Sequence, residues 1–323
     1  MKLLVTGGAG FIGSSFIRTL INERRDVEII NVDKLTYAGN LENLKSVETS
    51  PNYHFVQADI ADWKKMEALS EEFSFDAIIN FAAESHVDRS IKDSRAFVDS
   101  NIVGTHTLLE LARRKKIGRF LQVSTDEVYG ALGESGLFTE NTPLAPNSPY
   151  AASKTAADVL VRSYFKTYGF PTLITRCSNN YGPYQYPEKL IPLFIIRALN
   201  NEPLPLYGDG LYVRDWIHVE DHCRALLAVL EKGKEGDVYN IGARCEKKNV
   251  DIANHILQIL NKPKSLLKSV TDRLGHDRRY AIDPTKIETE LGWSPRHHLD
   301  DDLPGLIDWY QTNKTWWKKI LAV

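Results

Sequence analysis

The stretch Thr6–Gly13 reads TGGAGFIG and joins a short apolar run, Lys2–Thr6, to a longer amphipathic segment. Three of its glycines, Gly7, Gly10 and Gly13, recur at every third residue. Positions without side chains let the backbone approach a pyrophosphate at the positive end of the helix that follows. A glycine triplet on its own also fits an ordinary tight turn. The order strand, glycine turn and helix predicts the first unit of a dinucleotide-binding fold.

An acidic residue follows the glycine turn at the distance that this fold requires. Asp33 stands twenty residues after Gly13, at the end of the second predicted strand. A carboxylate there accepts hydrogen bonds from a ribose diol and repels a 2′-phosphate, so the expected cofactor is NAD and not NADP. Asp59 follows the third predicted strand, where it either meets the adenine end of the cofactor or caps a helix.

The first half of the chain alternates short β-branched runs with longer amphipathic stretches, which predicts a parallel sheet wrapped by helices. The predicted strands are Lys2–Thr6, Glu28–Asp33, Tyr53–Gln57, Ala77–Phe81, Arg119–Ser124 and Thr172–Arg176. The predicted helices are Phe11–Asn22, Asp62–Phe73, Phe97–Lys115 and Pro149–Tyr168. The fold class is therefore α/β, a doubly wound parallel sheet of the Rossmann type.

Beyond Arg176 the alternation gives way to a loop-rich stretch that contains many prolines. We place the domain transition there, with residues 1–178 as the dinucleotide-binding domain and 179–323 as a smaller C-terminal domain. Segments near 213–242, with strands at Val213–Ile217 and Val238–Ile241, are expected to return to the first domain. The stretch Asp302–Trp317 predicts one amphipathic helix whose tryptophans pack in the interior.

Composition excludes several classes of protein. The 323 residues are 43% hydrophobic and 25% charged, with a net charge of −2, which is typical of globular proteins and leaves no broad basic face for nucleic acid. No run approaches the length of a membrane span or of a signal-peptide apolar region. Three cysteines without metal or redox spacing favour free thiols in a reducing compartment. We therefore expect a cytoplasmic protein.

The sequence places a tyrosine and a lysine four residues apart, at Tyr150 and Lys154, on one face of a predicted helix. A phenol ionises near pH ~10, and a neighbouring ammonium group favours its anion. Such a pair can supply a base at neutral pH if lysine, cofactor charge and site dipoles together lower the phenol pKa. A pair with this spacing also occurs by chance in many helices.

The fifth predicted strand ends in two adjacent acids, in the stretch Leu121–Gly130, which reads LQVSTDEVYG. Ligands of a doubly wound sheet bind beyond the carboxyl ends of its strands, so Thr125, Asp126 and Glu127 emerge at the expected cleft. One carboxyl group can remove a proton while another protonates a leaving hydroxyl. In an extended strand the two acids would point to opposite faces, so we predict a bend that turns both into the cleft.

The motifs TGxxGxxG at Thr6–Gly13 and YxxxK at Tyr150–Lys154 resemble those of the extended short-chain dehydrogenase/reductase family, along nearly the whole chain. The tripeptide Thr125–Glu127 resembles the nucleotide-sugar 4,6-dehydratases within that family, in particular those that act on dTDP-glucose. Five further stretches carry this resemblance: Ala82–Ser90, Arg176–Pro183, Tyr186–Pro192, Arg214–Trp216 and Gly275–Tyr280.

The resemblance implies a dehydration in three stages. Tyr150 with Lys154 removes the hydroxyl proton at glucose carbon 4 while NAD accepts a hydride. Glu127 takes the proton from carbon 5, Asp126 protonates the departing hydroxyl at carbon 6, and Thr125 hydrogen-bonds the sugar. The hydride then returns to carbon 6 and a proton to carbon 5, which gives dTDP-4-keto-6-deoxy-glucose and regenerates NAD.

The resemblance also implies the residues of both binding sites. Those expected to contact NAD are Gly7, Gly10, Phe11, Ile12, Gly13, Asp33, Lys34, Leu35, Thr36, Asp59, Ile60, Phe81, Ala82, Ala83, Ser85, Ser100, Tyr150, Lys154 and Asn179. Those expected to contact the nucleotide sugar are Ser85, Thr125, Asn180, Lys189, Leu190, Pro205, Tyr207, Arg214, Asn249, Asp272, Arg273 and His276. Of the second set, Arg214 and Arg273 suit a diphosphate, because guanidinium groups match phosphate oxygens.

Three alternatives remain open: a dehydratase of UDP-glucose, a nucleotide-sugar 4-epimerase or decarboxylase, and a regulatory protein that only binds these ligands. An epimerase needs no elimination acid or base, so the acid pair argues against it. Leu274 departs from the proline of the most familiar family pattern, and 131–148 is shorter than in many relatives. His218 and His222 are four apart but have no evident third ligand, so we expect no metal. The family resemblance implies a homodimer through Phe97–Lys115 and Pro149–Tyr168.

Overall fold

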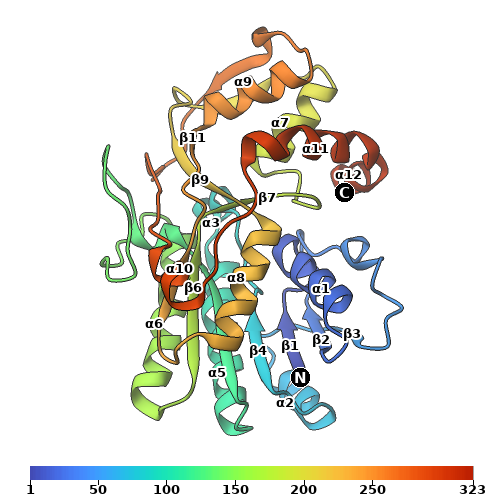
Figure 1. Cartoon of the computed structure of the whole chain (residues 1–323), viewed down its shortest axis with the longest axis vertical. Helices are drawn as coiled ribbons and strands as arrows, with labels where there is room; N and C mark the ends of the chain where they lie inside the picture. The colour runs from blue at the N-terminus through green and yellow to red at the C-terminus, as the bar shows by residue number, and fades with distance from the viewer. Residues whose placement is uncertain (323) are drawn as a thin grey trace.

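Seven strands form one parallel sheet in the order β10-β6-β5-β4-β1-β2-β3, in the lower part of Figure 1. The structure is a computed structural model and describes residues 1–322. These strands are β1 (Lys2–Thr6), β2 (Glu28–Asp33), β3 (Tyr53–Gln57), β4 (Ala77–Asn80), β5 (Arg119–Thr125), β6 (Thr172–Cys177) and β10 (Val238–Ile241). The chain leaves β1 toward β2 on one side and later returns to β4 on the other, which makes β1/β4 a topological switch point.

Helices cover both faces of this sheet. They are α1 (Phe11–Glu23), α2 (Trp63–Glu72), α3 (Val87–Lys92), α4 (Arg95–Phe97), α5 (Thr105–Arg114), α6 (Pro149–Tyr168), α8 (Val219–Lys232) and α10 (Thr285–Leu291), with short helical segments η1 (Leu41–Leu44), η2 (Val98–Gly104) and η3 (Asp126–Tyr129). Buried side chains of α1, α8 and α10 form one apolar layer against the sheet, and those of α2, α5 and α6 form the other. The predicted doubly wound α/β fold is confirmed.

One predicted helix is more complex than expected. Phe97–Lys115 contains the π-helical segment η2 before the α-helical α5. Single π-helical turns often occur at functional sites. Here Asn101 donates to Ser153 Oγ at 2.8 Å and accepts from the backbone N–H of Glu84 at 2.9 Å, so η2 is tied to α6 and to the chain after β4.

The second lobe stands above the sheet in Figure 1. It contains α7 (Leu190–Leu199), α9 (Asn249–Ile259), α11 (Leu299–Thr312), α12 (Lys314–Leu321), the short η4 (Lys264–Leu266), a three-stranded sheet β11-β9-β7 and a two-stranded sheet β12-β8. These strands are β7 (Asn179–Tyr181), β8 (Leu204–Tyr207), β9 (Val213–His218), β11 (Glu246–Lys248) and β12 (Leu267–Val270). One apolar cluster joins α7, α9, α11 and α12.

Two expectations for this half need correction. Of the two segments expected to return to the first sheet, only Val238–Ile241 pairs there; Val213–His218 pairs with β7 and β11 because its partners are strands of the second lobe. The single helix expected at Asp302–Trp317 is two helices, because Asn313 leaves helical geometry and its backbone N–H and side-chain amide both donate to Trp309 O.

Within residues 1–322, the helices fall short of the combined length and apolarity that crossing a bilayer requires. The side chains of Cys177, Cys223 and Cys245 are free thiols.

Candidate active site

The glycine turn between β1 and α1 packs too tightly for side chains. Gly7 has φ +71°, and a Cβ atom there would lie 2.5 Å from the backbone nitrogen of Ala82. A Cβ atom on Gly13 would lie 2.4 Å from the carbonyl oxygen of Gly7. The turn therefore holds the start of α1 directly against the ends of β1 and β4. This arrangement exposes backbone N–H groups at the helix N-terminus, where a pyrophosphate fits.

A cavity of about 350 Å³ opens at this turn and brings together most of the residues predicted to bind NAD. They are Gly7, Gly10, Phe11, Ile12, Gly13, Asp33, Lys34, Thr36, Asp59, Ile60, Phe81, Ala82, Ala83, Ser85, Ser100, Tyr150, Lys154 and Asn179. Leu35 is the exception and lies outside the lining. Its backbone N–H donates to Asp33 Oδ1 at 2.8 Å, so its contribution is to hold the acid in place.

The acids at the ends of β2 and β3 are both oriented by hydrogen bonds. Asp33 Oδ2 accepts from the backbone N–H of Ala9 at 2.9 Å, so the acid is fixed to the glycine turn itself. Burial raises the pKa of Asp33, while the N–H groups of Leu35 and Ala9 oppose that rise. Asp59 pairs with Lys34 at 2.6 Å, and the cap of α2 is Asp62 instead. Of the two roles considered for Asp59, the structure therefore excludes the cap of α2.

A second cavity, of about 210 Å³, adjoins the first and contains most of the predicted sugar-nucleotide residues. The predicted residues in it are Ser85, Lys189, Leu190, Pro205, Tyr207, Arg214, Asn249, Arg273 and His276, while Thr125 and Asn180 line the larger cavity. Asp272 lines neither. Its carboxylate accepts a hydrogen bond from Tyr212 and lies 2.7 Å from His276 Nδ1, so it orients that ring from behind.

The second cavity is electrostatically suited to an anion. Arg214 is buried, and its guanidinium donates to the carbonyl oxygens of Val213 at 2.7 Å and Asp277 at 3.0 Å, with no carboxylate within ion-pair distance among the described residues. Arg273, by contrast, pairs with Asp88 at 3.0 Å. Of the two predicted diphosphate ligands, Arg214 has the charge that is not neutralised by a neighbour. A diphosphate would satisfy it.

The bend predicted after β5 is confirmed, because η3 begins at Asp126. Thr125 caps this 3₁₀ turn, and its hydroxyl accepts from the backbone N–H of Glu127 at 3.3 Å. Both acids then face the same space: Asp126 lines the larger cavity, and Glu127 lines both. Asp126 Oδ1 is 3.3 Å from the threonine hydroxyl, whereas Asp126 Oδ2 is buried without a hydrogen-bond partner.

The two acids have different electrostatic surroundings. Burial raises the pKa of Asp126 well above its usual range, and the charges of Glu127 and Asp215 add to the rise. Burial also raises the pKa of Glu127, but Arg214, Lys189 and Arg273 oppose the rise. Pairs of carboxyls whose surroundings separate their pKa values are suited to acid and base roles. Asp126 is therefore suited to carry a proton and Glu127 to accept one.

The tyrosine and lysine are both buried at the start of α6 and line the larger cavity. Burial raises the pKa of Tyr150 well above its usual value, and Glu127 adds to the rise. Burial lowers the pKa of Lys154, whose Nζ donates to Val123 O at 2.8 Å. The expected lowering of the phenol pKa by lysine is thus not a property of the protein alone. A further positive charge in the cavity is needed to make Tyr150 a base at neutral pH.

Several lining residues escaped the sequence reasoning. Glu188 and Trp216 line both cavities. Trp316 lines the larger one, although the sequence predicted only a packing role for this tryptophan. Glu188 stands next to Lys189 in Tyr186–Pro192, so the motif itself was the available signal. Trp316 carries no such signal, because it reaches the cavity only through the way in which α12 folds back.

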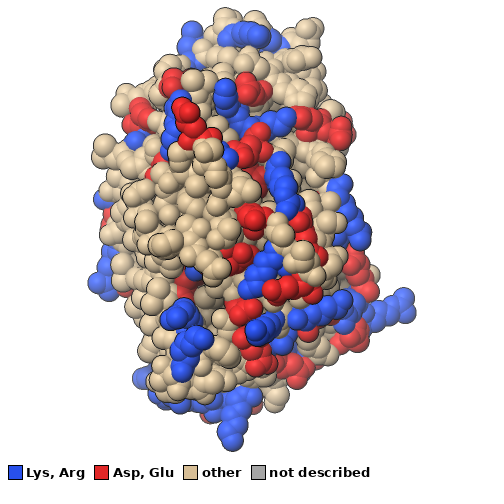
Figure 2. All heavy atoms as spheres, turned by 60° about the vertical axis from the view of Figure 1, so that its left-hand side comes forward, with Lys and Arg blue, Asp and Glu red and all other residues tan. Residues whose placement is uncertain are grey.

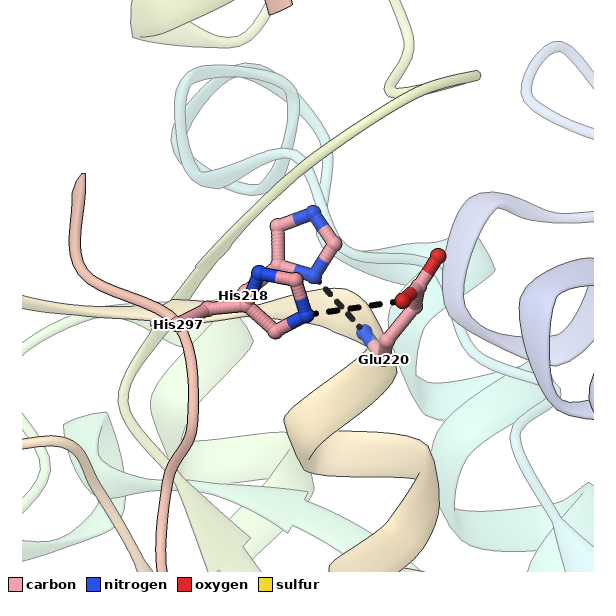
Figure 3. Close-up of side chains that lie close together, drawn as sticks. All are labelled: His218, Glu220 and His297. Carbon is pink, nitrogen blue, oxygen red and sulfur yellow. Dashed lines mark hydrogen bonds and ion pairs between the residues drawn. The ribbon is translucent and has the colours of Figure 1, made fainter. Parts of the chain in front are cut away.

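His218, Glu220 and His297 form a cluster that spacing in the sequence does not reveal (Figure 3). His218 Nδ1 accepts from the backbone N–H of Glu220 at 3.3 Å and so caps α8, and the rings of His218 and His297 stack with centroids 4.0 Å apart and an interplanar angle of 24°. A metal lies in the plane of the imidazole that binds it, so two stacked rings cannot share one ion. His222 Nδ1 instead faces Asn180 Oδ1 at 2.8 Å. The cluster is therefore a helix cap and a packing contact.

A doubly wound sheet, a glycine turn with a carboxylate after β2, and a buried Tyr-x-x-x-Lys pair at the same cavity together define an extended short-chain dehydrogenase/reductase. The family model described as GDP-mannose 4,6 dehydratase matches residues 4–303. The dTDP-glucose 4,6-dehydratase of Xanthomonas campestris is 52% identical, with 98% of this chain and 95% of that protein aligned.

Two solved structures agree with this class. The dTDP-glucose 4,6-dehydratase of Bacillus anthracis, in complex with NAD, has a TM-score of 0.93 at 51% identity and covers 99% of both chains. That of Streptomyces venezuelae, with NAD and TYD bound, has a TM-score of 0.96 at 49% identity, covering 99% of this chain and 100% of the other. The chain belongs to the dTDP-glucose 4,6-dehydratase family.

Proposed function

We propose that this protein is a hydro-lyase that converts dTDP-glucose to dTDP-4-keto-6-deoxy-glucose with NAD as cofactor. The observation that carries the proposal is the turn at the end of β5, where Asp126 and Glu127 lie at the junction of the two cavities with different electrostatic surroundings. An epimerase has no use for a second acid and base. The relatives that are about half identical across the whole chain act on dTDP-glucose by name, which favours this substrate over UDP-glucose.

The residues of the larger cavity fit a dinucleotide. The glycine turn presents backbone N–H groups to a pyrophosphate, and Asp33 stands ready for a ribose diol while its charge disfavours a 2′-phosphate. Bound here, NAD supplies a hydride acceptor for sugar carbon 4, a hydride donor for carbon 6, and positive charge beside Tyr150. The larger cavity adjoins the second one, because seven residues line both: Ser85, Glu127, Asn179, Glu188, Lys189, Leu190 and Trp216.

In this mechanism the side chains of the protein move protons at the 4-hydroxyl, at carbon 5 and at the 6-hydroxyl, and a proton returns to carbon 5 when carbon 6 accepts the hydride. Tyr150 takes the proton of the 4-hydroxyl, and Lys154 lines the same cavity four residues further along α6. Oxidation at carbon 4 acidifies the hydrogen on carbon 5, which Glu127 removes. Asp126 donates its proton to the 6-hydroxyl, which leaves as water, and its unpartnered Oδ2 is free to make that contact. Each proton transfer of this kind contributes about 10²- to 10⁴-fold to the rate.

The function is tested with purified protein, NAD and either dTDP-glucose or UDP-glucose. We expect dTDP-glucose to lose one water and give a 4-keto-6-deoxy product, observed by mass spectrometry and NMR. UDP-glucose lacks the methyl group of thymine and carries a ribose 2′-hydroxyl. It is expected to react more slowly by about 10- to 200-fold, because the missing methyl group alone discriminates by ~1–3 kcal/mol. A galactose product would instead identify an epimerase, and binding without turnover would identify a regulatory protein.

A second prediction concerns the cofactor. Replacing Asp33 with asparagine removes the charge that accepts from a ribose diol, so NAD affinity is expected to fall about 10-fold or more while discrimination against NADP weakens. Calorimetric titration of cofactor-stripped protein with both dinucleotides measures this. Asp62→Asn is the matched control, because Asp62 caps α2 outside both cavities. Unchanged affinities in Asp33→Asn would contradict the assigned ribose contact.

We also propose a homodimer formed through η2, α5 and α6. The side of the molecule that carries α6 comes forward in Figure 2, which shows a broad area without charged side chains, flanked by charged ones. Three exposed valines lie on these elements: Val98 at 39%, Val103 at 42% and Val159 at 53% exposure. Exposed apolar residues on neighbouring elements, η2 and α6, are consistent with a protein contact there. The three free thiols support a cytoplasmic location.

A further inference from the structure

The last helix crosses from the second lobe to the dinucleotide cavity. In Figure 1, α12 lies directly above α1, although nearly the whole chain separates them. Trp316 and Ile320 of α12 line the larger cavity together with the glycine turn. One wall of this cavity is therefore built by α12, which lies outside the seven-stranded sheet and its glycine turn.

Two hydrogen bonds connect α12 to the glycine turn. The indole N–H of Trp316 donates to Asn43 Oδ1 at 2.9 Å, and Asn43 Nδ2 donates to the carbonyl oxygen of Ala9 at 3.1 Å. Asn43 is 3% exposed; its bond to Ala9 is buried, and the bond from Trp316 is partly buried. Ala9 is also the residue whose N–H is held by Asp33. The turn is thus fixed from one side by the ribose acid and from the other by the tryptophan.

A second set of contacts supports the same link. Tyr184 packs edge-on against Trp309 and Trp316, with ring centroids 4.8 Å and 5.7 Å away, and the guanidinium of Arg18 lies 4.4 Å from the Tyr184 ring centroid. Arg18 also donates to the carbonyl oxygen of Asn43 at 2.6 Å. Helix α1, segment η1 and helix α12 therefore meet around one aromatic cluster at the edge of the cavity.

We propose that Trp316 is a further cofactor-positioning residue, and that α12 acts as a brace that holds the glycine turn and sets how long the dinucleotide stays bound. The proposal rests on the proposed function in that NAD is the ligand of this cavity. The proposed reaction returns the hydride that it takes, so the protein has no need to exchange cofactor at each turnover. A wall contributed by a separate helix makes release depend on breaking the Trp316–Asn43 bond.

The test measures release of the dinucleotide and needs no sugar. Protein loaded with the fluorescent analogue etheno-NAD is mixed with excess NAD, and the loss of bound fluorescence gives the release rate. Trp316→Phe keeps the ring but removes the indole N–H, so release is expected to be about 2- to 10-fold faster, the range for one lost hydrogen bond. Trp316→Ala, which also removes the wall, is expected to release faster still.

Trp309→Phe is the matched control, because Trp309 belongs to the same aromatic cluster but contacts neither Asn43 nor the cavity. Its release rate is expected to stay within about 2-fold of the unaltered protein. Equally faster release in both phenylalanine variants would show that any change in the aromatic cluster loosens the site, and it would overturn the proposal. An unchanged release rate in Trp316→Phe would overturn it as well. Failure of the proposed function would show separately, as absent turnover of dTDP-glucose by the unaltered protein.

Discussion

Replacing Glu127 with glutamine is expected to lower the turnover of dTDP-glucose by about 10²- to 10⁴-fold, the usual contribution of one general base. Glutamine has nearly the same shape and keeps the η3 turn, but it cannot accept the carbon-5 proton. Oxidation at carbon 4 precedes that step and should survive. We therefore expect the absorbance of reduced nicotinamide to appear when dTDP-glucose is added, with little 4-keto-6-deoxy product.

The control for this variant is Glu134→Gln, because Glu134 is exposed in the 131–148 loop and lines neither cavity. It should retain full turnover. The pH dependence adds a second criterion. A base must be ionised, and since burial raises the pKa of Glu127, the unaltered protein should lose kcat/KM on the acid side at a higher pH than an exposed glutamate would allow. Full turnover by Glu127→Gln would remove this residue from the mechanism.

Replacing Tyr150 with phenylalanine should abolish the first step and lower turnover by about 10²- to 10⁴-fold. The phenylalanine ring fits the same buried position, where Tyr150 packs edge-on against Phe97 with ring centroids 6.3 Å apart, so the fold is expected to persist. In contrast to the glutamine variant, no nicotinamide absorbance change should follow the addition of sugar. Undiminished cofactor reduction would contradict the role of the phenol as base.

Tyr129→Phe is a suitable comparison for Tyr150→Phe. Tyr129 is also a buried tyrosine; its hydroxyl donates to Asn240 Oδ1 at 2.7 Å and accepts from the Arg176 guanidinium at 3.0 Å, away from both cavities. Its loss is expected to lower the free energy of unfolding by about 2 kcal/mol and to leave the first step intact. The pair of variants therefore separates loss of a buried hydroxyl from loss of the reacting one.

Much of the first lobe follows from local sequence. The strands around the glycine turn match their predicted bounds to within one residue, because apolar runs and glycines mark where parallel strands begin and end. The acid pair was also predictable, since a carboxyl end of a strand in this fold faces the ligand. These inferences need only neighbours in the sequence and the rule that parallel strands present one end to the cleft.

The second lobe shows where such reasoning stops. Val213–His218 resembles any short strand, and nothing local tells which sheet it joins, because pairing with β7 and β11 is decided by the lobe as a whole. The break at Asn313 was missed because an amphipathic pattern continues through it. Trp316 was assigned to packing, since an aromatic residue in an amphipathic helix carries no sign of what the helix will cover.

The pKa shifts of the site residues could not be predicted from the sequence either. Spacing alone suggested that Lys154 lowers the pKa of Tyr150, but the pKa of a buried phenol depends first on loss of water and then on the charges around it. Here burial raises the pKa of Tyr150, and the charges of Glu127 and Asp126 raise it further. Only the packed structure shows that the negative charges of the acids disfavour ionisation of the tyrosine.

The seven residues that line both cavities come from both lobes of the protein. Among them, Glu127 belongs to the lower lobe, whereas Lys189, Leu190 and Trp216 belong to the upper lobe. In the proposed mechanism the protons move in the lower lobe, so substitutions in the upper lobe beyond these shared residues are expected to change the preference for the nucleotide base without changing the proton transfers. Engineers who want an altered sugar donor should redesign there first.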